Sequence, residues 1–417
     1  MVYIYSKVSN EKNFFGLNDP VQLVEKHGTP LYVYNENILR KRCRDLRGLL
    51  TYPKFTVNFS PKANSSLELL KIVRSEGLRV DAMSPGEIYV NLMAGYKPDE
   101  IFYISNNVNK EELLYAIQAG VNVSVDSLSQ LELFGKINHG GRVAFRINPG
   151  VGAGHHEKVM TAGQKTKFGI EMTSLPEVKN ILKKYKLKLT GINQHIGSLF
   201  MDGDAYLKST ENILSCALEF EDLEFIDLGG GFGIPYRKQA NQLRLNLKDL
   251  GEKLTGVITK WVGIYGKEIE FKVEPGRYIV AESCILLGTV NAVKMNYNIK
   301  YIGTDLGFNV LLRPAMYDSH HDVEIYRRED VMSMKQETVR IVGNICETGD
   351  IIAKDRLLPE IFEDDVIGIM DSGAYGYSMS SNYNLRLRPA EVLIDSEGND
   401  RLIRRRDTFE DLVRNFV

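Results

Sequence analysis

The alternation of short apolar runs with amphipathic, helix-like segments constrains the fold of this chain more than any other feature of its sequence. The apolar runs are rich in Val, Ile and Phe and lack strict polar alternation, as expected of strands buried on both faces. There are eight, at residues 55–58, 78–81, 101–105, 121–125, 143–147, 189–196, 225–228 and 270–273. Eight strands that alternate with helices predict an α/β fold of the (β/α)8 TIM-barrel type, with a doubly wound open sheet as the structural alternative.

The segments between these runs carry helix start and stop signals. Ser84-Pro85-Gly86-Glu87 combines a capping box with a proline at the first helical position. Residues 109–112 begin the next helix, which ends at Gly120, and longer helices are expected at 204–220 and 247–264. Helices of this kind between the strands are what a barrel requires.

The last third of the chain follows a different pattern, with short strands between turn residues. These strands are expected at 284–293, 300–305, 322–328, 337–342, 366–370, 390–394 and 401–404. No long helix separates them, which indicates an all-β domain, and an amphipathic helix at 408–416 closes the chain. The run 29–34 is a further strand that is expected to pair with this domain. The predicted domains are therefore a barrel, 35–282, and a β-rich domain formed by 1–34 and 283–417.

Charge and cysteine content exclude several classes of protein. The net charge is only −2, so neither a nucleic acid nor a membrane surface is expected as a partner. The N-terminus lacks the basic and apolar regions of a signal peptide, and no apolar run approaches the length of a membrane span. The four cysteines form no CxxC pair, so a reduced, cytoplasmic location is expected.

Reactive side chains follow several predicted strands, at the end where barrel enzymes carry their active sites. Lys62 follows the first strand, His195 ends the sixth, Gly229-Gly230-Gly231 follows the seventh and Glu274 ends the eighth. Taken singly, each has a plainer explanation, such as a solvated lysine, a core histidine or a packing turn. Together they suit pyridoxal 5′-phosphate, which needs an amine for attachment, a stacking ring, an acid at its pyridine nitrogen and a phosphate cradle.

A metal explains the pattern less well. His155-His156 and His320-His321 are adjacent pairs, whose members point apart on a strand or a helix. No HExxH or comparable spacing is present. We therefore expect no metal site.

A long set of short motifs runs in order through nearly the whole chain. They are Pro61-Lys62-Ala63-Asn64, Arg146-Ile147-Asn148-Pro149, Lys167-Phe168-Gly169, His195-Ile196-Gly197-Ser198, Gly229-Gly230-Gly231, Glu274-Pro275-Gly276-Arg277, Arg313-Pro314-Ala315-Met316-Tyr317, Cys346-Glu347 and Gly373-Ala374-Tyr375-Gly376. In kind and order they resemble the fold-type-III pyridoxal-phosphate-dependent decarboxylases, whose barrel is of the alanine-racemase type. Within that family, the chain most resembles the group that acts on diaminopimelate.

The resemblance implies a role for each matching position. Lys62 would be the catalytic attachment point of the cofactor, His195 would stack on its ring, and Glu274 would keep its nitrogen protonated. Cys346 would be the catalytic proton donor and would reach, with Glu347, the barrel of the other subunit, which implies a homodimer with shared active sites. The other cofactor-binding residues would be Ser198, Gly229, Gly230, Gly231, Gly276, Arg277 and Tyr375, and the substrate-binding residues Arg277, Arg313, Tyr317, Glu347 and Tyr375.

The implied reaction is the decarboxylation of meso-diaminopimelate to L-lysine and CO₂, the last step of lysine biosynthesis. Arg313 suits the distal carboxylate of this substrate and Glu347 its distal ammonium. The alternative is a decarboxylase of lysine, ornithine or a carboxylated polyamine, although these typically carry Cys-Asp in place of Cys346-Glu347. A racemase would need a second base facing the lysine, and a cofactor-homeostasis protein would usually be a barrel without a β-domain.

The chain departs from the family pattern at two places. Pro61 precedes the lysine where a small or aliphatic residue is usual, and Thr348-Gly349 replaces a Ser-containing pair. Neither change removes a reacting group. Residues 150–156 and 161–163 resemble the family's mobile loop over the site.

Overall fold

The computed structural model describes residue 5 and residues 7–150, 166–327 and 335–417. Its contacts divide the chain into two compact units. The barrel unit contains Arg40–Ile234 and Arg244–Ile279, and the sheet unit contains Met1–Leu39, Pro235–Leu243 and Val280–Val417. The chain therefore passes from one unit to the other four times.

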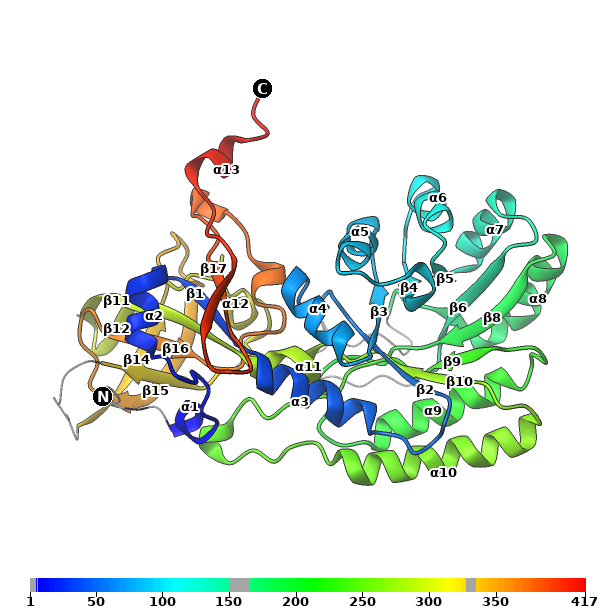
Figure 1. The fold of residues 1–417 in the computed structure, drawn as a ribbon, viewed down its shortest axis with the longest axis horizontal. Coiled ribbons are helices and arrows are strands. Elements are labelled where there is room, and N and C mark those ends of the chain that lie inside the picture. Colours follow the sequence, from blue (N-terminus) through cyan, green and yellow to red (C-terminus); the bar gives the residue numbers. More distant parts are fainter. Residues whose placement is uncertain (1–4, 6, 151–165, 328–334) are drawn as a thin grey trace. The chain divides into compact units, whose positions relative to one another are not determined.

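Eight parallel strands form a closed barrel, which confirms the predicted fold and excludes the open sheet (Figure 1). Strand β5 pairs with β6, and β10 pairs with β2, so the ring has no free edge. All eight predicted strands are present, and a two-residue strand, β7 Ile170–Glu171, lies beside β6. The barrel strands are β2 Phe55–Phe59, β3 Arg79–Ala82, β4 Ile101–Ile104, β5 Asn122–Val125, β6 Arg142–Asn148, β8 Lys188–Asn193, β9 Phe225–Asp227 and β10 Glu270–Val273.

The helices of the barrel unit alternate with its strands and begin at the predicted caps. The Ser84 hydroxyl accepts a hydrogen bond from the Glu87 backbone N–H at 3.2 Å, and Asn109 and Glu112 form a reciprocal capping box. Such caps satisfy backbone N–H groups that have no partner inside the helix. The helices are α4 Leu67–Ser75, α5 Pro85–Met93, α6 Lys110–Gln118, α7 Leu128–Ile137, α8 Leu175–Lys184, α9 Asp204–Ala217 and α10 Leu247–Tyr265.

In the described residues, the sheet unit contains nine strands. Seven of them follow the order β15-β14-β12-β11-β1-β17-β18, while β16 pairs with β11 and with β13. Strand β15 was not predicted, because Lys354-Asp355-Arg356 interrupts its apolar pattern; these charges are tolerated because β15 lies at the sheet edge. The strands are β1 Leu31–Asn35, β11 Cys284–Asn296, β12 Ile299–Thr304, β13 Val323–Tyr326, β14 Gln336–Val342, β15 Ile351–Pro359, β16 Val366–Ile369, β17 Ala390–Ile394 and β18 Asp400–Arg404.

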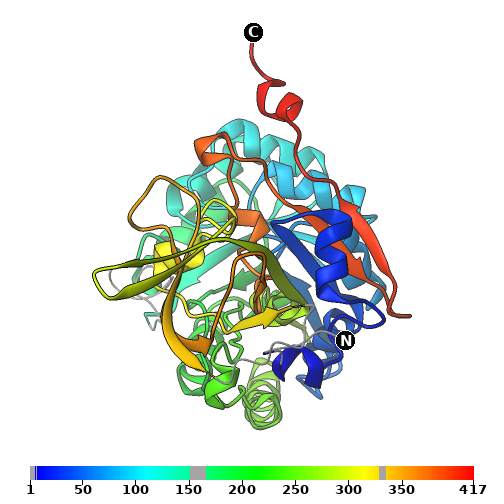
Figure 2. The ribbon, with the colours of Figure 1, turned by 90° about the vertical axis from the view of Figure 1, so that its left-hand side faces the viewer.

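Strand β1 lies in the middle of this sheet, as the predicted pairing of 29–34 requires (Figure 2). It runs antiparallel to β11 and parallel to β17. Leu31 and Val33 are fully buried and belong to an apolar cluster, in which the rings of Phe15 and Tyr326 meet edge to face at 5.6 Å. The core of the sheet unit therefore forms around a strand from the N-terminus of the chain.

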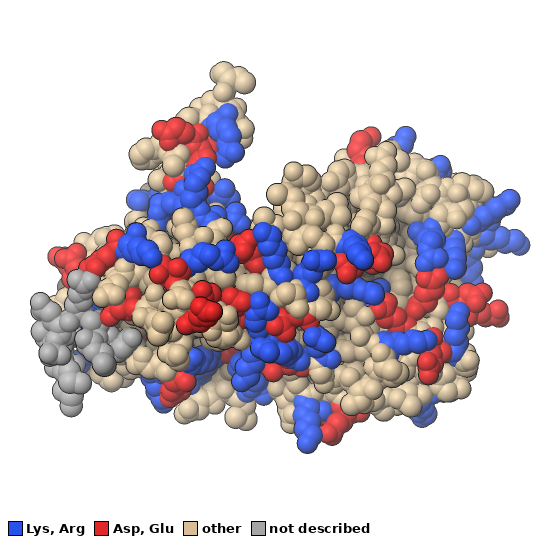
Figure 3. Space-filling view, viewed as in Figure 1, with Lys and Arg blue, Asp and Glu red and all other residues tan. Residues whose placement is uncertain are grey.

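The remaining helices are short, apart from α2 and α3. They are α1 Lys7–Glu11, α2 Pro20–His27, α3 Glu36–Arg47, α11 Arg277–Val280, α12 Arg313–Tyr317 and α13 Phe409–Val413. None of the helices in the described part of the chain combines the length and the hydropathy needed to span a bilayer. Acidic and basic side chains are interspersed over the face shown in Figure 3, in keeping with a net charge of −2.

Candidate functional site

The barrel unit brings the predicted reactive residues to the carboxyl ends of four strands. Lys62 lies three residues after β2, and Glu274 follows β10 directly. His195 lies two residues after β8, which ends at Asn193 and is therefore shorter than the predicted strand. The three glycines begin two residues after β9. Since all eight strands run in parallel, these ends meet on one face of the barrel.

The three glycines form a turn that side chains would not fit. A Cβ at Gly229 would lie 2.2 Å from the Gln194 carbonyl oxygen, and one at Gly230 would lie 1.9 Å from the Glu274 carbonyl oxygen. Gly231 has φ +105°, a conformation that favours glycine. The turn thus packs its backbone directly against the segments after β8 and β10, and backbone N–H groups of this kind can bind an anion.

The loop after β10 is held against the lysine loop. The Ser60 backbone N–H donates to the Pro275 carbonyl at 3.1 Å, and a Cβ at Gly276 would lie 2.9 Å from the Cβ of Ala63. Arg277 is buried, and its guanidinium donates to the Ser198 hydroxyl at 2.9 Å. The predicted phosphate-binding residues of the barrel unit therefore come from neighbouring loops.

The imidazole of His195 is held in its neutral form. Its Nδ1 accepts a hydrogen bond from the Gly230 backbone N–H at 3.2 Å. Burial, followed by the positive charges of Lys62 and Arg146, holds the pKa of His195 well below its ordinary value. A neutral, half-buried ring attached to the glycine turn suits stacking on another flat ring.

Glu274 is a buried carboxyl group that forms no ion pair among the described residues. Burial, followed by the neighbouring Asp227 and Asp81, raises its pKa well above the ordinary value, although Lys62 and Arg146 oppose the shift. Among the described residues, its Oε1 atom has no hydrogen-bond partner. A buried acceptor without a partner is costly, so this carboxyl group is suited to pair with a protonated nitrogen of a bound molecule.

Sequence reasoning missed Asp81, which also belongs to this cluster. Asp81 is fully buried in β3 and accepts a hydrogen bond from the Ser60 hydroxyl, while its Oδ1 atom has no partner among the described residues. Burial raises its pKa to about 7, while the charge of Lys62 and the bond from Ser60 oppose the shift. A charged residue at the end of an apolar barrel strand was the one available signal, but it does not by itself distinguish Asp81 from a solvated aspartate.

The pKa of Asp81 makes the stability of the cofactor-free protein depend on pH. An unfolded aspartate titrates near pH 3.9, roughly, whereas folded Asp81 has a pKa of about 7, so the folded chain binds the extra proton between these values. Stability is therefore expected to fall as the pH rises from about 4 to 7 and to level off above that. Between about pH 5 and pH 8, the melting temperature of Asp81→Asn should therefore fall by a few degrees less than that of the wild-type protein. Thermal melts of cofactor-free protein test this, with the exposed Asp99→Asn as control; equal pH slopes in both variants would contradict it.

The sheet unit carries the other predicted residues. Arg313 is almost fully buried, donates to His321 Nε2 at 2.7 Å and lies over the ring of Tyr236, with 4.6 Å between Cζ and the ring centre. Tyr317 ends the same short helix, α12. Tyr375 is half-buried and has φ +56°. Their roles in the site remain predictions.

Cys346 and Glu347 lie on an exposed turn of the sheet unit, fixed by two neighbouring side chains. The Asn384 amide donates to Cys346 Sγ at 3.2 Å and accepts from the Cys346 backbone N–H at 3.2 Å. The Tyr383 hydroxyl donates to Glu347 Oε1 at 2.8 Å. The turn is therefore ordered, with its thiol on the surface of the unit.

Two predictions concern other features. One prediction is that residues 150–156 and 161–163 resemble a mobile loop. These residues, apart from Gly150, lie outside the described part of the chain. Across the parts of the chain that the structure describes, no group of three or more His, Cys, Asp or Glu residues has the arrangement of a metal site.

Comparisons with known proteins agree with this geometry. Residues 36–281 match the family model described as the pyridoxal-binding domain of pyridoxal-dependent decarboxylases. A diaminopimelate decarboxylase of Methanothermobacter thermautotrophicus is 43% identical over 95% of this chain and 93% of its own length. The crystal structure of the Helicobacter pylori diaminopimelate decarboxylase with L-lysine superposes with a TM-score of 0.87 at 29% identity, covering 95% of this chain and 98% of that one. A lysine/ornithine decarboxylase of Vibrio vulnificus shares the fold, with a TM-score of 0.76 over 91% of this chain and 98% of that one, but only 19% of its sequence.

Proposed function

The chain belongs to the pyridoxal-dependent decarboxylases, in the diaminopimelate decarboxylase family, and from this we propose that it converts meso-diaminopimelate to L-lysine and CO₂. The observation that carries the proposal is that Lys62, His195, Glu274 and the glycine turn all lie at the carboxyl ends of the barrel strands. The diaminopimelate decarboxylase of Methanothermobacter thermautotrophicus is 43% identical to this chain, whereas the lysine/ornithine enzyme shares the fold at only 19% identity.

We propose pyridoxal 5′-phosphate as the cofactor, because the barrel unit offers a complementary group for each of its parts. The unpartnered Oε1 of Glu274 suits the pyridine nitrogen, and the glycine turn with Ser198, Gly276 and Arg277 suits the phosphate. Lys62 would supply the amine for covalent attachment, and Tyr375 would add a phosphate contact from the sheet unit. When bound, the cofactor supplies a ring that takes up the negative charge left at Cα when CO₂ departs.

The residues around the ring would then divide the work. Glu274 would hold a proton at the ring nitrogen, because a buried carboxylate ionises readily only beside a cation. His195 would orient the ring and exclude water from one of its faces, since its neutral imidazole is hydrogen-bonded to the turn. Cys346 would deliver a proton to Cα, a step in which a positioned acid contributes roughly 10²–10⁴-fold.

Substrate choice would depend on groups that pair with both distal charges. Arg313 or Arg277 would bind the distal carboxylate, Glu347 the distal ammonium, and Tyr317 and Tyr375 would line the same end. A site that pairs a buried cation with a carboxylate rejects a substrate lacking that carboxylate, because the cation would be left unpaired. Lysine and ornithine lack it.

We further propose a homodimer in which Cys346 and Glu347 serve the barrel of the partner subunit. Both side chains lie on an ordered but exposed turn, as expected of residues that act on another surface. A cytoplasmic location belongs to the same proposal and is supported by four cysteines that form no disulfide.

Purified enzyme loaded with the cofactor is expected to release CO₂ from meso-diaminopimelate, with turnover of L-lysine and L-ornithine lower by roughly 10²-fold or more. Labelled CO₂ release, with L-lysine identified as the product, measures this directly. Comparable turnover of ornithine would favour the alternative decarboxylase reaction. Loss of chirality without CO₂ release would favour a racemase.

A further inference from the structure

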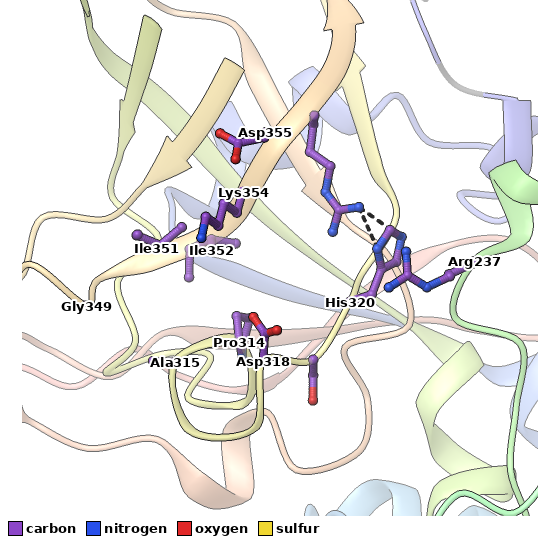
Figure 4. A pocket seen from close by; sticks show the side chains of 12 residues that line it. Arg237, Pro314, Ala315, Asp318, His320, Gly349, Ile351, Ile352, Lys354 and Asp355 are labelled. Atoms are coloured by element: carbon purple, nitrogen blue, oxygen red, sulfur yellow. Dashed lines mark hydrogen bonds between the residues drawn. The ribbon is translucent and has the colours of Figure 1, made fainter. Parts of the chain in front are cut away.

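A cavity of about 440 Å³ lies wholly within the sheet unit and belongs to no part of the proposed active site (Figure 4). Its walls come from α12 and the residues after it, from the start and middle of β15, and from Arg237 in the segment Pro235–Leu243. His320 and Arg237 lie side by side at one end, and Asp318 lies on another wall. The cavity is lined by three basic side chains, Arg237, Lys354 and Arg356, and by two acidic ones, Asp318 and Asp355.

The hydrogen bonds of His320 determine its charge. Its Nε2 lies 2.9 Å from Asp322 Oδ1, and its Nδ1 is bonded to Arg356 Nη1. A guanidinium can only donate, so Nδ1 must accept and the proton must lie on Nε2. His320 is therefore neutral, and Arg356 receives an imidazole rather than a carboxylate as its partner. The other contacts of Arg356 are long ones, 3.4 Å from Nη1 to His320 Nε2 and 3.5 Å from Nη2 to the His321 carbonyl.

Two guanidinium charges consequently face the same space without a bonded carboxylate. Burial, followed by the like charge of Arg237, lowers the pKa of Arg356, which shows that the two groups repel each other. Among the described residues, the Nε atom of Arg356 is buried without a hydrogen-bond partner. A pair of like charges around an unpaired donor is stabilised when an anion lies between them.

The nearby acids do not supply that anion. Asp322 is already bonded to His320, and Asp355 is bonded to Arg340 at 2.8 Å. Asp318 contributes an attractive charge to Arg356, but it forms no hydrogen bond with it among the described residues. Of the nearby acids, only Asp318 therefore has no ion pair among the described residues, and it stands against three basic side chains in the cavity.

We propose that this cavity binds a small, doubly charged oxyanion, with Arg237 and Arg356 as its main ligands. Planar guanidinium groups bind phosphate and carboxylate oxygens through paired hydrogen bonds, and Lys354 adds charge at the cavity wall. The site goes beyond the proposed decarboxylase function, because none of its ligands is assigned to cofactor or substrate. A phosphate group and a dicarboxylate share the required chemistry, and the experiment distinguishes them.

Calorimetric titration of the cofactor-loaded enzyme tests the proposal, first with inorganic phosphate and then with succinate, in a zwitterionic buffer at low ionic strength. We expect saturable binding of one anion per chain, weakened about tenfold or more in Arg237→Gln. Arg237 is exposed, so its loss should not disturb folding. Arg414→Gln, which removes the same charge from the C-terminal helix region, should bind like the wild type.

Each outcome decides the matter. Binding of phosphate alone identifies a phosphate group as the ligand, and binding of succinate alone identifies a dicarboxylate. Binding of neither, or binding that is equal in wild type and Arg237→Gln, overturns the proposal. Release of the cofactor during the titration, seen as loss of its absorbance, would assign the heat to the active site and would also overturn it. None of these results depends on turnover, so failure here leaves the decarboxylase proposal unaffected.

Discussion

Lys62→Ala is expected to lose decarboxylase activity by roughly 10²–10⁴-fold or more. The amine is the proposed attachment point of the cofactor, and it lies among Asp81, His195 and Glu274, whose pKa values all depend on its charge. Removing it would deprive the proposed cofactor of its covalent bond and the carboxyl groups of a nearby positive charge.

Two measurements separate this role from a loss of folding. Borohydride reduction of the wild-type enzyme, followed by peptide mass analysis, should find the cofactor on the peptide containing Lys62. The variant should retain a wild-type circular dichroism spectrum. Lys54→Ala, at the opposite end of β2 with its side chain half exposed, serves as the control and should keep full activity. A cofactor adduct on another lysine would overturn the assignment.

Mixing two inactive variants is expected to restore activity. Cys346→Ala alone should lower kcat by roughly 10²–10⁴-fold, because the proposed proton donor is missing. In a hybrid dimer of Lys62→Ala and Cys346→Ala, one site would combine an intact Lys62 with an intact Cys346 of the partner. Random exchange of subunits makes half of the dimers hybrids. Each hybrid has one intact site out of two, so about a quarter of the wild-type activity should return.

The experiment requires subunits that exchange, so the variants are mixed in mild denaturant, dialysed together and then assayed. Each variant treated alone in the same way is the control and should stay inactive. If Cys346 serves the barrel of its own chain, every chain in the mixture contains one defect and no activity returns. That result would contradict the shared site while leaving the reaction itself unaffected.

The barrel was predictable because its strands are short, apolar and separated by capped helices. The eight runs match the eight strands, and the capping residues Ser84 and Asn109 begin helices where expected. The site was partly predictable for the same reason, since a residue placed after a strand end is placed in space by the closure of the barrel.

Other features depend on contacts that local patterns do not report. β15 could not be recognised because its charged residues interrupt the apolar pattern of a strand. The sheet tolerates these charges because β15 is an edge strand with a neighbour on one side only. Asp81 was missed because its importance arises from burial beside Ser60 and Lys62, and not from any motif. Arg313 and Cys346 follow two different strands of the sheet unit. Without the family resemblance, nothing in the local sequence indicated that either residue belongs to the site.

The central place of β1 has a consequence for how the protein is made. β1 pairs with β11, which begins some 250 residues later, and with β17, which begins at Ala390 near the end of the chain. A ribosome therefore releases this apolar strand long before either neighbour exists, while every barrel strand is complete by Val273. Unpaired strands of this kind promote aggregation during synthesis. We therefore expect truncated chains that end before β17 to need chaperones more than the complete protein does.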